Sequence, residues 1–188
     1  GVSIEAAGDY KNLTNYQLAE KVKDQYGDKI AMISIGPAGE MKMSAASIAV
    51  TDREFRPTRH AGRGGVGAVM GSKGIKAIIL DETGTSMRQP ANAEKFREAN
   101  RTFVQGLRNH AVTGQGLPAY GTNVLTNVIN EAGAYPTYNF KQGQYSDATK
   151  ISGESIAELE TSRGGNPTHG CHRGCAIQCS GIFVDKDG

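Results

Sequence analysis

The pattern of apolar and polar residues predicts an amphipathic helix near the start of the chain. Apolar residues recur at helical spacing over about three turns, which suits one face of that helix to packing against a core. Thr14 precedes this stretch and Gly27 follows it, and these residue types are typical of a helix N-cap and a helix end. The apolar positions are Leu18, Ala19, Val22 and Tyr26.

Short apolar runs then indicate β-strands. We expect strands at residues 30–35, 45–50 and 75–80, with a forced turn at Gly36–Glu40 between the first two. Strand character stops after the third run. Beyond it the spacing of apolar residues becomes helical, so the fold class is α+β, with a β-rich part at residues 1–85 and a mainly helical part at 86–188.

Capping residues mark the expected helices of the second part. Asn92, Thr122 and Ser152 are suited to begin helices, and Gly133 is suited to end one. The predicted helices cover about residues 92–109, 122–132 and 153–162.

Overall charge and hydropathy exclude several classes of protein. The formal net charge of +2 over 188 residues is too small for a nucleic-acid or membrane-surface binder, which needs clustered basic residues. No apolar run approaches the roughly 20 residues that cross a bilayer, and the N-terminal residues lack a secretion signal. We therefore expect a cytoplasmic protein with no nucleic-acid or membrane partner. Because Gly1 is the first residue and a strand-like run stops at Gly188, we also expect an internal fragment of a longer chain.

A glycine-rich stretch, Ala61–Lys73, is suited to holding an anion. Glycines let main-chain N–H groups converge on a phosphate, a following helix N-terminus adds its dipole, and Arg63 and Lys73 can supply positive charge. The stretch contains Gly-x-Gly-x-x-Gly with Asp81 about 20 residues on, as in a dinucleotide-binding unit, but it lacks a clear preceding strand and room for a long helix. It also lacks the Gly-Lys-Ser/Thr ending of a nucleotide P-loop. The structural alternative is a tight glycine corner.

The cysteines indicate a metal site. All three, Cys171, Cys175 and Cys179, fall within nine residues, and nearby glycines oppose a regular helix there. An odd number of cysteines in a cytosolic chain argues against a disulfide framework. Three readings stay open: an iron–sulfur cluster with a fourth thiolate from elsewhere, a zinc site completed by His169 or His172, and a buried stripe of small residues.

Several motifs in order resemble one known family. Gly36–Glu40, then Ala61–Lys73 with Lys76–Ile78, resemble the N-terminal domain of the aldehyde:ferredoxin oxidoreductase family. Gly133–Phe140 and the cysteine loop are similar to the start of that family's helical region. The resemblance covers nearly the whole chain.

The resemblance implies tungsten, or less often molybdenum, held by two pyranopterins (tungstopterin or molybdopterin), with a [4Fe–4S] cluster beside one pterin. It implies an aldehyde-type substrate oxidised to an acid and ferredoxin or a similar electron carrier, and it allows a homodimer of the full-length protein. Residues 1–85 would be the C-terminal part of the cofactor-binding domain, and residues 86–188 would begin the helical, cluster-bearing domain.

The resemblance also implies site residues. The Ala61 carbonyl would face a magnesium ion that bridges the pterin phosphates, and Cys171, Cys175 and Cys179 would hold the cluster. The family usually spaces these cysteines C-x-x-C-x-x-x-C, whereas here the first gap holds three residues. Catalytic residues are unknown, and neither Glu40 nor His60 is assigned an acid–base role. The cofactor-binding residues would be His60, Ala61, Gly62, Arg63, Gly64 and Gly65.

Overall fold

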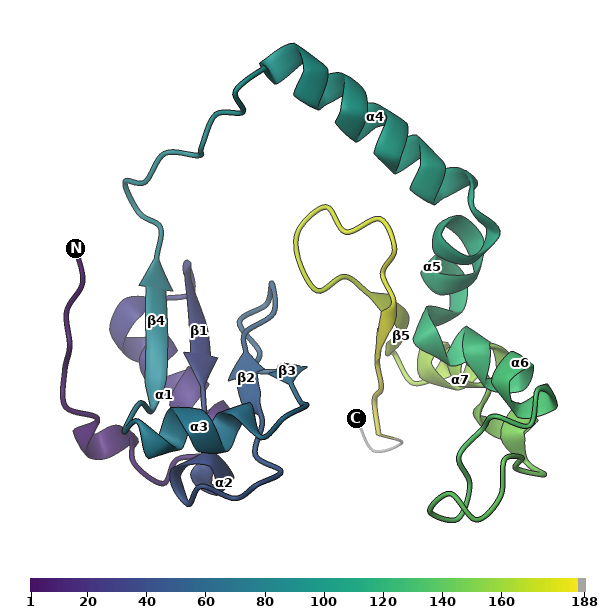
Figure 1. The fold of residues 1–188 in the computed structure, drawn as a ribbon, viewed down its shortest axis with the longest axis horizontal. Coiled ribbons are helices and arrows are strands. Elements are labelled where there is room, and N and C mark those ends of the chain that lie inside the picture. The colour runs from purple at the N-terminus through teal and green to yellow at the C-terminus, as the bar shows by residue number, and fades with distance from the viewer. Residues whose placement is uncertain (186–188) are drawn as a thin grey trace. The chain divides into compact units, whose positions relative to one another are not determined.

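The computed structural model describes residues 1–185 and divides the chain into two compact units (Figure 1). The first unit is Gly1–Met87, and the second begins at Arg88. The sequence placed the division after residue 85. The first unit is built on a sheet and the second mainly on helices, which confirms the α+β class.

The first unit contains a four-stranded sheet in the order β3-β2-β1-β4, and all neighbouring strands are antiparallel. The expected strands correspond to β1, β2 and β4. β3 was not expected, because three residues of the sequence Arg-His-Ala carry no apolar alternation. The strands are β1 (Ile30–Ser34), β2 (Ile48–Val50), β3 (Arg59–Ala61) and β4 (Ala77–Asp81).

The predicted first helix is α1 (Asn15–Tyr26), and its N-terminus carries a capping box. The Gln17 backbone N–H donates to Thr14 Oγ1 at 3.3 Å, and the Thr14 N–H donates to Gln17 Oε1 at 3.0 Å. Each side chain thus satisfies a backbone donor that the first turn leaves unpaired. Gly27 ends the helix with a φ of 81°, a conformation that glycine adopts without strain.

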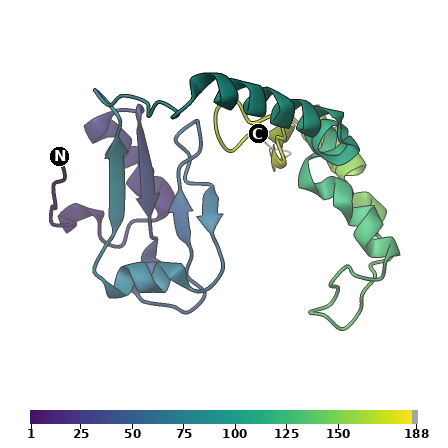
Figure 2. The same ribbon diagram turned by 45° about the horizontal axis from the view of Figure 1, so that its top comes forward.

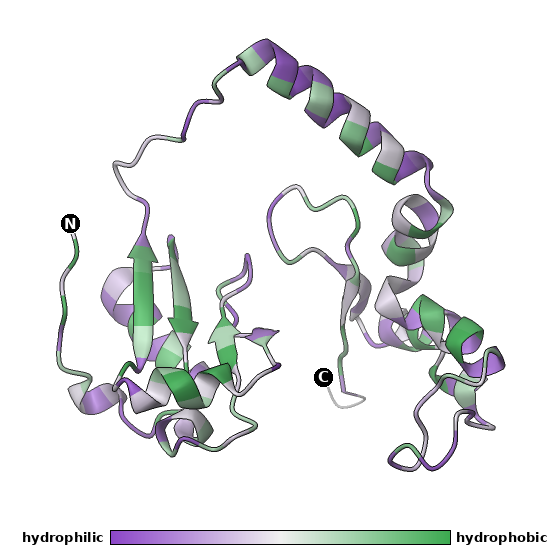
Figure 3. Ribbon diagram, viewed as in Figure 1, coloured by the Kyte–Doolittle hydropathy of each residue, from purple (hydrophilic) through white to green (hydrophobic). Residues whose placement is uncertain are grey.

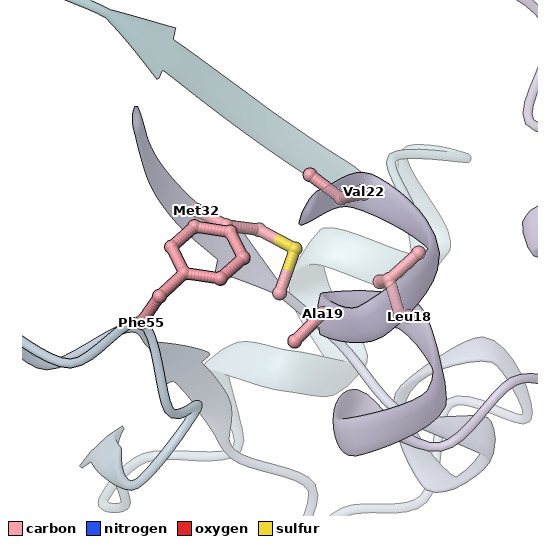
Figure 4. Close-up of a cluster of buried hydrophobic side chains, with 5 residues drawn as sticks. All are labelled: Leu18, Ala19, Val22, Met32 and Phe55. Atoms are coloured by element: carbon pink, nitrogen blue, oxygen red, sulfur yellow. The ribbon is translucent and has the colours of Figure 1, made fainter. Parts of the chain in front are cut away.

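The apolar face of α1 forms the core of the first unit. Figure 4 shows Leu18, Ala19 and Val22 from α1 gathered with Met32 from β1 and Phe55 from the β2–β3 loop. All five side chains are buried. Three of the four apolar positions predicted for this face are therefore core residues, and the helix packs on one face of the sheet (Figure 2).

Two short helices lie in the first unit, and one of them was expected as a turn. The Gly36–Glu40 turn contains a single helical turn, α2 (Pro37–Glu40), because proline suits the first position of a helix. The glycine-rich stretch contains a two-turn helix, α3 (Val66–Ser72). Its length agrees with the expectation that this stretch lacks room for a long helix, and Gly67 and Gly71 lie where α3 approaches other backbone closely. A short 3₁₀ turn, Gly8–Tyr10, precedes α1.

The second unit contains helices at the three predicted places, but the second begins at Leu125 after a 3₁₀ turn and not at Thr122 as predicted. Asn92 caps α4 by accepting from the Lys95 N–H at 2.9 Å, and Ser152 caps α7 by accepting from the Ser155 N–H at 3.5 Å. α4 mixes apolar with charged positions (Figure 3), and none of its residues is buried. The helices are α4 (Ala93–Asn109), α5 (Leu117–Tyr120), α6 (Leu125–Glu131) and α7 (Gly153–Ser162), with a π-helical turn at Ala111–Gly116 and 3₁₀ turns at Gly121–Val124 and Ala148–Ile151.

A short hairpin follows α7. β5 (Asn166–His169) pairs antiparallel with β6 (Ser180–Ile182), so the expectation that strand character stops after residue 80 was wrong. These strands are too short to show the alternation that sequence reading depends on. The ten residues between them form the cysteine loop, residues 170–179, which projects from the hairpin (Figure 1). No helix within residues 1–185 is long and apolar enough to span a bilayer.

Candidate cofactor and metal sites

Three glycines of the glycine-rich stretch are required by packing within the first unit. A Cβ atom on Gly65 would lie 2.5 Å from the Ser44 carbonyl oxygen, and one on Gly67 would lie 2.4 Å from that of Ser47. A Cβ atom on Gly71 would lie 1.9 Å from the Gly39 carbonyl oxygen. These distances are shorter than non-bonded atoms tolerate. The structural alternative, a tight glycine corner, therefore explains Gly65, Gly67 and Gly71.

Gly62 and Gly64 differ from those three. A Cβ atom on either would meet no atom within 4 Å, and only Gly64, with a φ of 79°, needs glycine for its backbone conformation. The segment from Ala61 to Gly64 is exposed, and the N–H groups of Gly62, Arg63 and Gly64 donate no hydrogen bond within residues 1–185. Open glycines with unused N–H donors fit the close approach of an anionic group.

The basic side chains predicted beside this loop have different positions. Arg63 lies in the loop and forms no ion pair within the described residues. Lys73 follows α3, whose seven residues separate it from the loop by about 10 Å. His60 lies on β3, where its Nδ1 is 2.9 Å from Ser47 Oγ. The structure thus places His60 and Arg63 near the open glycines but not Lys73.

The sheet topology argues against a dinucleotide-binding unit. Such a unit requires a strand, a helix and a second strand parallel to the first. Here β3 and β4 flank α3 in sequence, yet they lie at opposite edges of a sheet whose neighbouring strands are all antiparallel. The Gly-x-Gly-x-x-Gly spacing is therefore not a Rossmann fingerprint.

An ion pair between the buried Lys76 and the half-buried Glu40, which the sequence analysis did not predict, connects segments of the first unit. Lys76 Nζ contacts Glu40 Oε1 and donates to the Leu13 carbonyl at 2.9 Å, and the Lys76 side chain is only 6% exposed. Burial raises the pKa of the Glu40 carboxyl, but hydrogen bonds from Lys76 and Asn12 outweigh burial and leave the pKa below its usual value. Glu40 thus joins α2 to the loop before α1 and to the entry of β4. The signal for it was a lysine within the apolar run 75–80.

The cysteine loop brings two of the three predicted metal ligands together. Cys171, His172 and Cys175 present donor atoms within 4.8 Å of one another. Cys179, at the end of the loop, belongs to no such group among the described residues. Its carbonyl accepts from the N–H and Oγ1 of Thr122 at 2.8 and 2.7 Å, which anchors the loop. All three thiols are free, and Cys171 and Cys179 are exposed.

The environment of Cys175 fits a metal-binding thiolate. The Gln178 N–H lowers the pKa of the Cys175 thiol, burial raises it, and the N–H groups of Ile177 and Cys171 lower it further, so that the pKa falls below its ordinary value. The thiolate is the form that binds metals. Backbone donors directed at the sulfur also suit an iron–sulfur cluster, whose potential depends on such hydrogen bonds.

His172 occupies the lengthened gap between the first two cysteines. Its Nδ1 lies 2.8 Å from the carbonyl oxygen of Arg173. A carbonyl only accepts, so in the neutral ring this contact places the proton on Nδ1 and leaves Nε2 with a free lone pair. His169, the other histidine considered as a ligand, is buried on β5 and is absent from this group of donors.

Comparison with known proteins gives a consistent result for both units. The family model described as aldehyde ferredoxin oxidoreductase, N-terminal domain, matches residues 1–82. The model for domains 2 and 3 of the same family matches residues 98–188. The chain belongs to the aldehyde ferredoxin oxidoreductase family. The two matches follow one another along the chain, as the resemblance in the sequence predicted.

Relatives named tungsten-containing aldehyde ferredoxin oxidoreductase support this membership. The match to the protein of Pyrococcus furiosus is 45% identical over 153 residues, which is 81% of this chain. The matches to the proteins of Pyrococcus horikoshii and Thermococcus kodakarensis are each 44% identical, over 155 and 156 residues respectively, and each covers 82% of this chain. In each case the match spans 24% of the relative. The chain thus corresponds to about a quarter of a family protein.

Proposed function

We propose that this chain forms part of a tungsten (or molybdenum) bis-pterin oxidoreductase that converts an aldehyde to a carboxylic acid in the cytoplasm. The observation that carries the proposal is the ordered match of both units to one family whose relatives are named for tungsten, aldehyde and ferredoxin. The three free thiols also suit a reducing compartment. The conversion adds oxygen from water to the aldehyde and releases a pair of electrons with protons.

The first unit would hold one side of the cofactor. His60 and the loop from Ala61 to Gly65 would approach the pterin phosphates, because Gly62 and Gly64 leave space and their N–H groups are unused. Arg63 would supply positive charge to the phosphates, and the Ala61 carbonyl would help to hold a magnesium ion. When bound, the pterin-held metal supplies the redox chemistry, and the chain binds and orients it.

The second unit would carry electrons away. Cys171, Cys175 and Cys179 would bind a [4Fe–4S] cluster, with a fourth thiolate from another part of the complete protein. The lowered pKa of Cys175 favours the thiolate that a cluster needs. Ferredoxin or a similar carrier would accept the electrons.

A zinc site is the second candidate for the cysteine loop. The grouping of Cys171, His172 and Cys175 within 4.8 Å favours it, because zinc accepts mixed thiolate and imidazole ligands. Under this alternative the loop has a structural role or mediates an interaction, and His172 Nε2 is a ligand.

An activity measurement on the complete protein tests the proposed reaction. Protein purified without oxygen is supplied with a series of aldehydes and with ferredoxin or a viologen dye. We expect dye reduction in step with acid formation. Protein that contains both metals but reduces neither acceptor with any aldehyde would contradict the proposed reaction.

A further inference from the structure

Glu160 is a buried carboxylate for which the described residues supply no partner. Glu160 lies on α7 and is 4% exposed, yet its carboxylate forms no hydrogen bond or ion pair within residues 1–185. Burial alone raises the pKa of this carboxyl, and no donor lowers it. An unpaired carboxylate in such a position is costly unless a donor or a cation reaches it.

Among the described residues, the buried Asp52 and the half-buried Glu40 are well supplied with donors. Asp52 accepts from the N–H groups of Glu54 and Arg56 and from the Thr58 hydroxyl, at 2.9–3.1 Å. Glu40 is paired with Lys76. Within residues 1–185, burial of a carboxyl group without a donor is therefore particular to Glu160.

Glu160 opens into a pocket of about 300 Å³ within the second unit. Gly121 and Gly181 line this pocket with it. A Cβ atom on Gly181 would lie 3.0 and 3.2 Å from the two Glu160 carboxylate oxygens and 3.2 Å from the Pro167 carbonyl oxygen. The two glycines thus leave the carboxylate and a carbonyl facing open space.

The pocket lining includes hydrogen-bond acceptors and one aromatic residue. Tyr120 and Asn123 also border it, and the Thr122 hydroxyl is already committed to the Cys179 carbonyl. A hard metal ion such as calcium takes six or more oxygen ligands at short range, and one carboxylate in so roomy a pocket does not provide them. An ammonium or guanidinium group fits better, because it donates to carboxylate and carbonyl oxygens and is attracted to an aromatic face.

We propose that the pocket beside Cys179 binds an organic cation, an ammonium or guanidinium group, with Glu160 as its counter-ion. The cation comes either from a free small molecule or from a lysine or arginine side chain elsewhere in the complete protein. The site is formed by residues of α7, β6 and the 3₁₀ turn at Gly121–Val124. It does not depend on a cluster being bound.

Methylguanidinium is the probe for this site in the 188-residue chain. Its binding is followed by the backbone amide NMR signals of Gly121 and Gly181 during a titration into the millimolar range. We expect saturable shifts of both signals. Because a hydrogen bond to a charged group is lost, Glu160→Gln should weaken binding at least about tenfold. Glu158→Gln, an exposed carboxyl on the same helix, should bind as the wild type does.

A second variant keeps the test decisive if Glu160→Gln does not fold. Gly181→Ala retains the carboxylate but places a methyl group against its oxygens, so it should also weaken binding. Saturable shifts that survive both changes, or no saturable shift in the wild type, would overturn the proposal.

The complete protein distinguishes the two sources of the cation. If the natural ligand is a free molecule, methylguanidinium binds the complete protein as it binds this chain. If a side chain of the complete protein fills the pocket, the probe binds this chain alone, and Glu160→Gln lowers the melting temperature of the complete protein more than Glu158→Gln does. A complete protein that neither binds the probe nor responds more strongly to Glu160→Gln would contradict both sources.

Discussion

The glycine-rich loop and the cysteine loop are held in place by different means. Around the first, Gly65, Gly67 and Gly71 bring backbone into close contact with carbonyls of other segments, so packing of the first unit fixes the segment. The cysteine loop is anchored at its ends, where Thr122 binds the Cys179 carbonyl and Ser180 Oγ donates to the His169 carbonyl at 2.9 Å. Within it, the Cys175 N–H donates to the His172 carbonyl at 3.3 Å.

This difference indicates that the two proposed sites acquire their shape in different ways. Packing at Gly65, Gly67 and Gly71 preorganises α3 and the end of the glycine-rich loop, whereas residues 61–64 stay exposed. The cysteine loop is held by hydrogen bonds rather than by close backbone packing, and a metal or cluster would add to its order. Substitution of the packed glycines should therefore lower stability, whereas changes at the open glycines should affect cofactor binding. Changes in the cysteine loop should affect metal content.

Loss of a cluster ligand should give the largest effect. In the complete protein, Cys175→Ser should remove most of the iron, because a serine oxygen is a poorer iron ligand than a thiolate. Tungsten should be retained in part, and dye reduction should slow. Iron, sulfide and tungsten analysis with the visible spectrum measures this.

His172→Gln is the matched change in the same loop. If a cluster is bound by the cysteines alone, iron content stays near that of the wild type. Loss of metal from His172→Gln equal to that from Cys175→Ser would instead favour the zinc site.

Crowding of the packed glycines should give the next largest effect, and it should act on stability. Gly71→Ala places a methyl group against the Gly39 carbonyl, so we expect about 3 kcal/mol lower free energy of unfolding. Gly62→Ala meets open space and should change stability by less than about 0.5 kcal/mol. Thermal and urea unfolding of both variants would measure the difference. Equal stabilities would show that the two groups of glycines are not distinct.

Arg63→Ala should have a smaller effect, and it should act on cofactor retention. Removing a charge that faces a phosphate should weaken retention of tungsten in the complete protein roughly tenfold, with little change in melting temperature. Lys73→Ala is the control, because α3 separates Lys73 from the loop. Unchanged tungsten content with a lower melting temperature would show that Arg63 contributes to stability and not to cofactor retention.

The pH dependence of unfolding should show the smallest effect, with opposite signs for two glutamates. The folded-state pKa of Glu40 is lowered, so its contribution is present above the unfolded pKa of about 4.3 and is lost as the pH falls toward the folded value. The pKa of Glu160 is raised, so its contribution is present below about pH 4.3 and is lost as the pH rises through the folded value. The free energy of unfolding is measured across the acid pH range for Glu40→Gln and Glu160→Gln. Each variant should lose the pH dependence that its glutamate contributes. Slopes of the same sign would contradict this difference.

Sequence patterns predicted the longer elements and failed on the short ones. α1, α4 and α7 begin at the residues expected to cap them, because capping depends on local sequence. β3 and the β5–β6 hairpin carry three or four residues per strand, too few for periodicity to show.

The division of the glycines could not be predicted, because it depends on carbonyls that are distant in sequence. Glu160 left a signal that was overlooked. Gly153, Ile156 and Ala157 precede it at spacings of seven, four and three residues, which places its carboxylate on the inner face of α7.

Metal analysis of the complete protein, purified without oxygen, tests the proposed function most directly. We predict iron and acid-labile sulfide in equal amounts, together with tungsten or molybdenum and an extractable pterin, and a brown colour from the cluster. Colourless protein that holds one zinc ion and neither iron nor pterin would contradict both proposed sites.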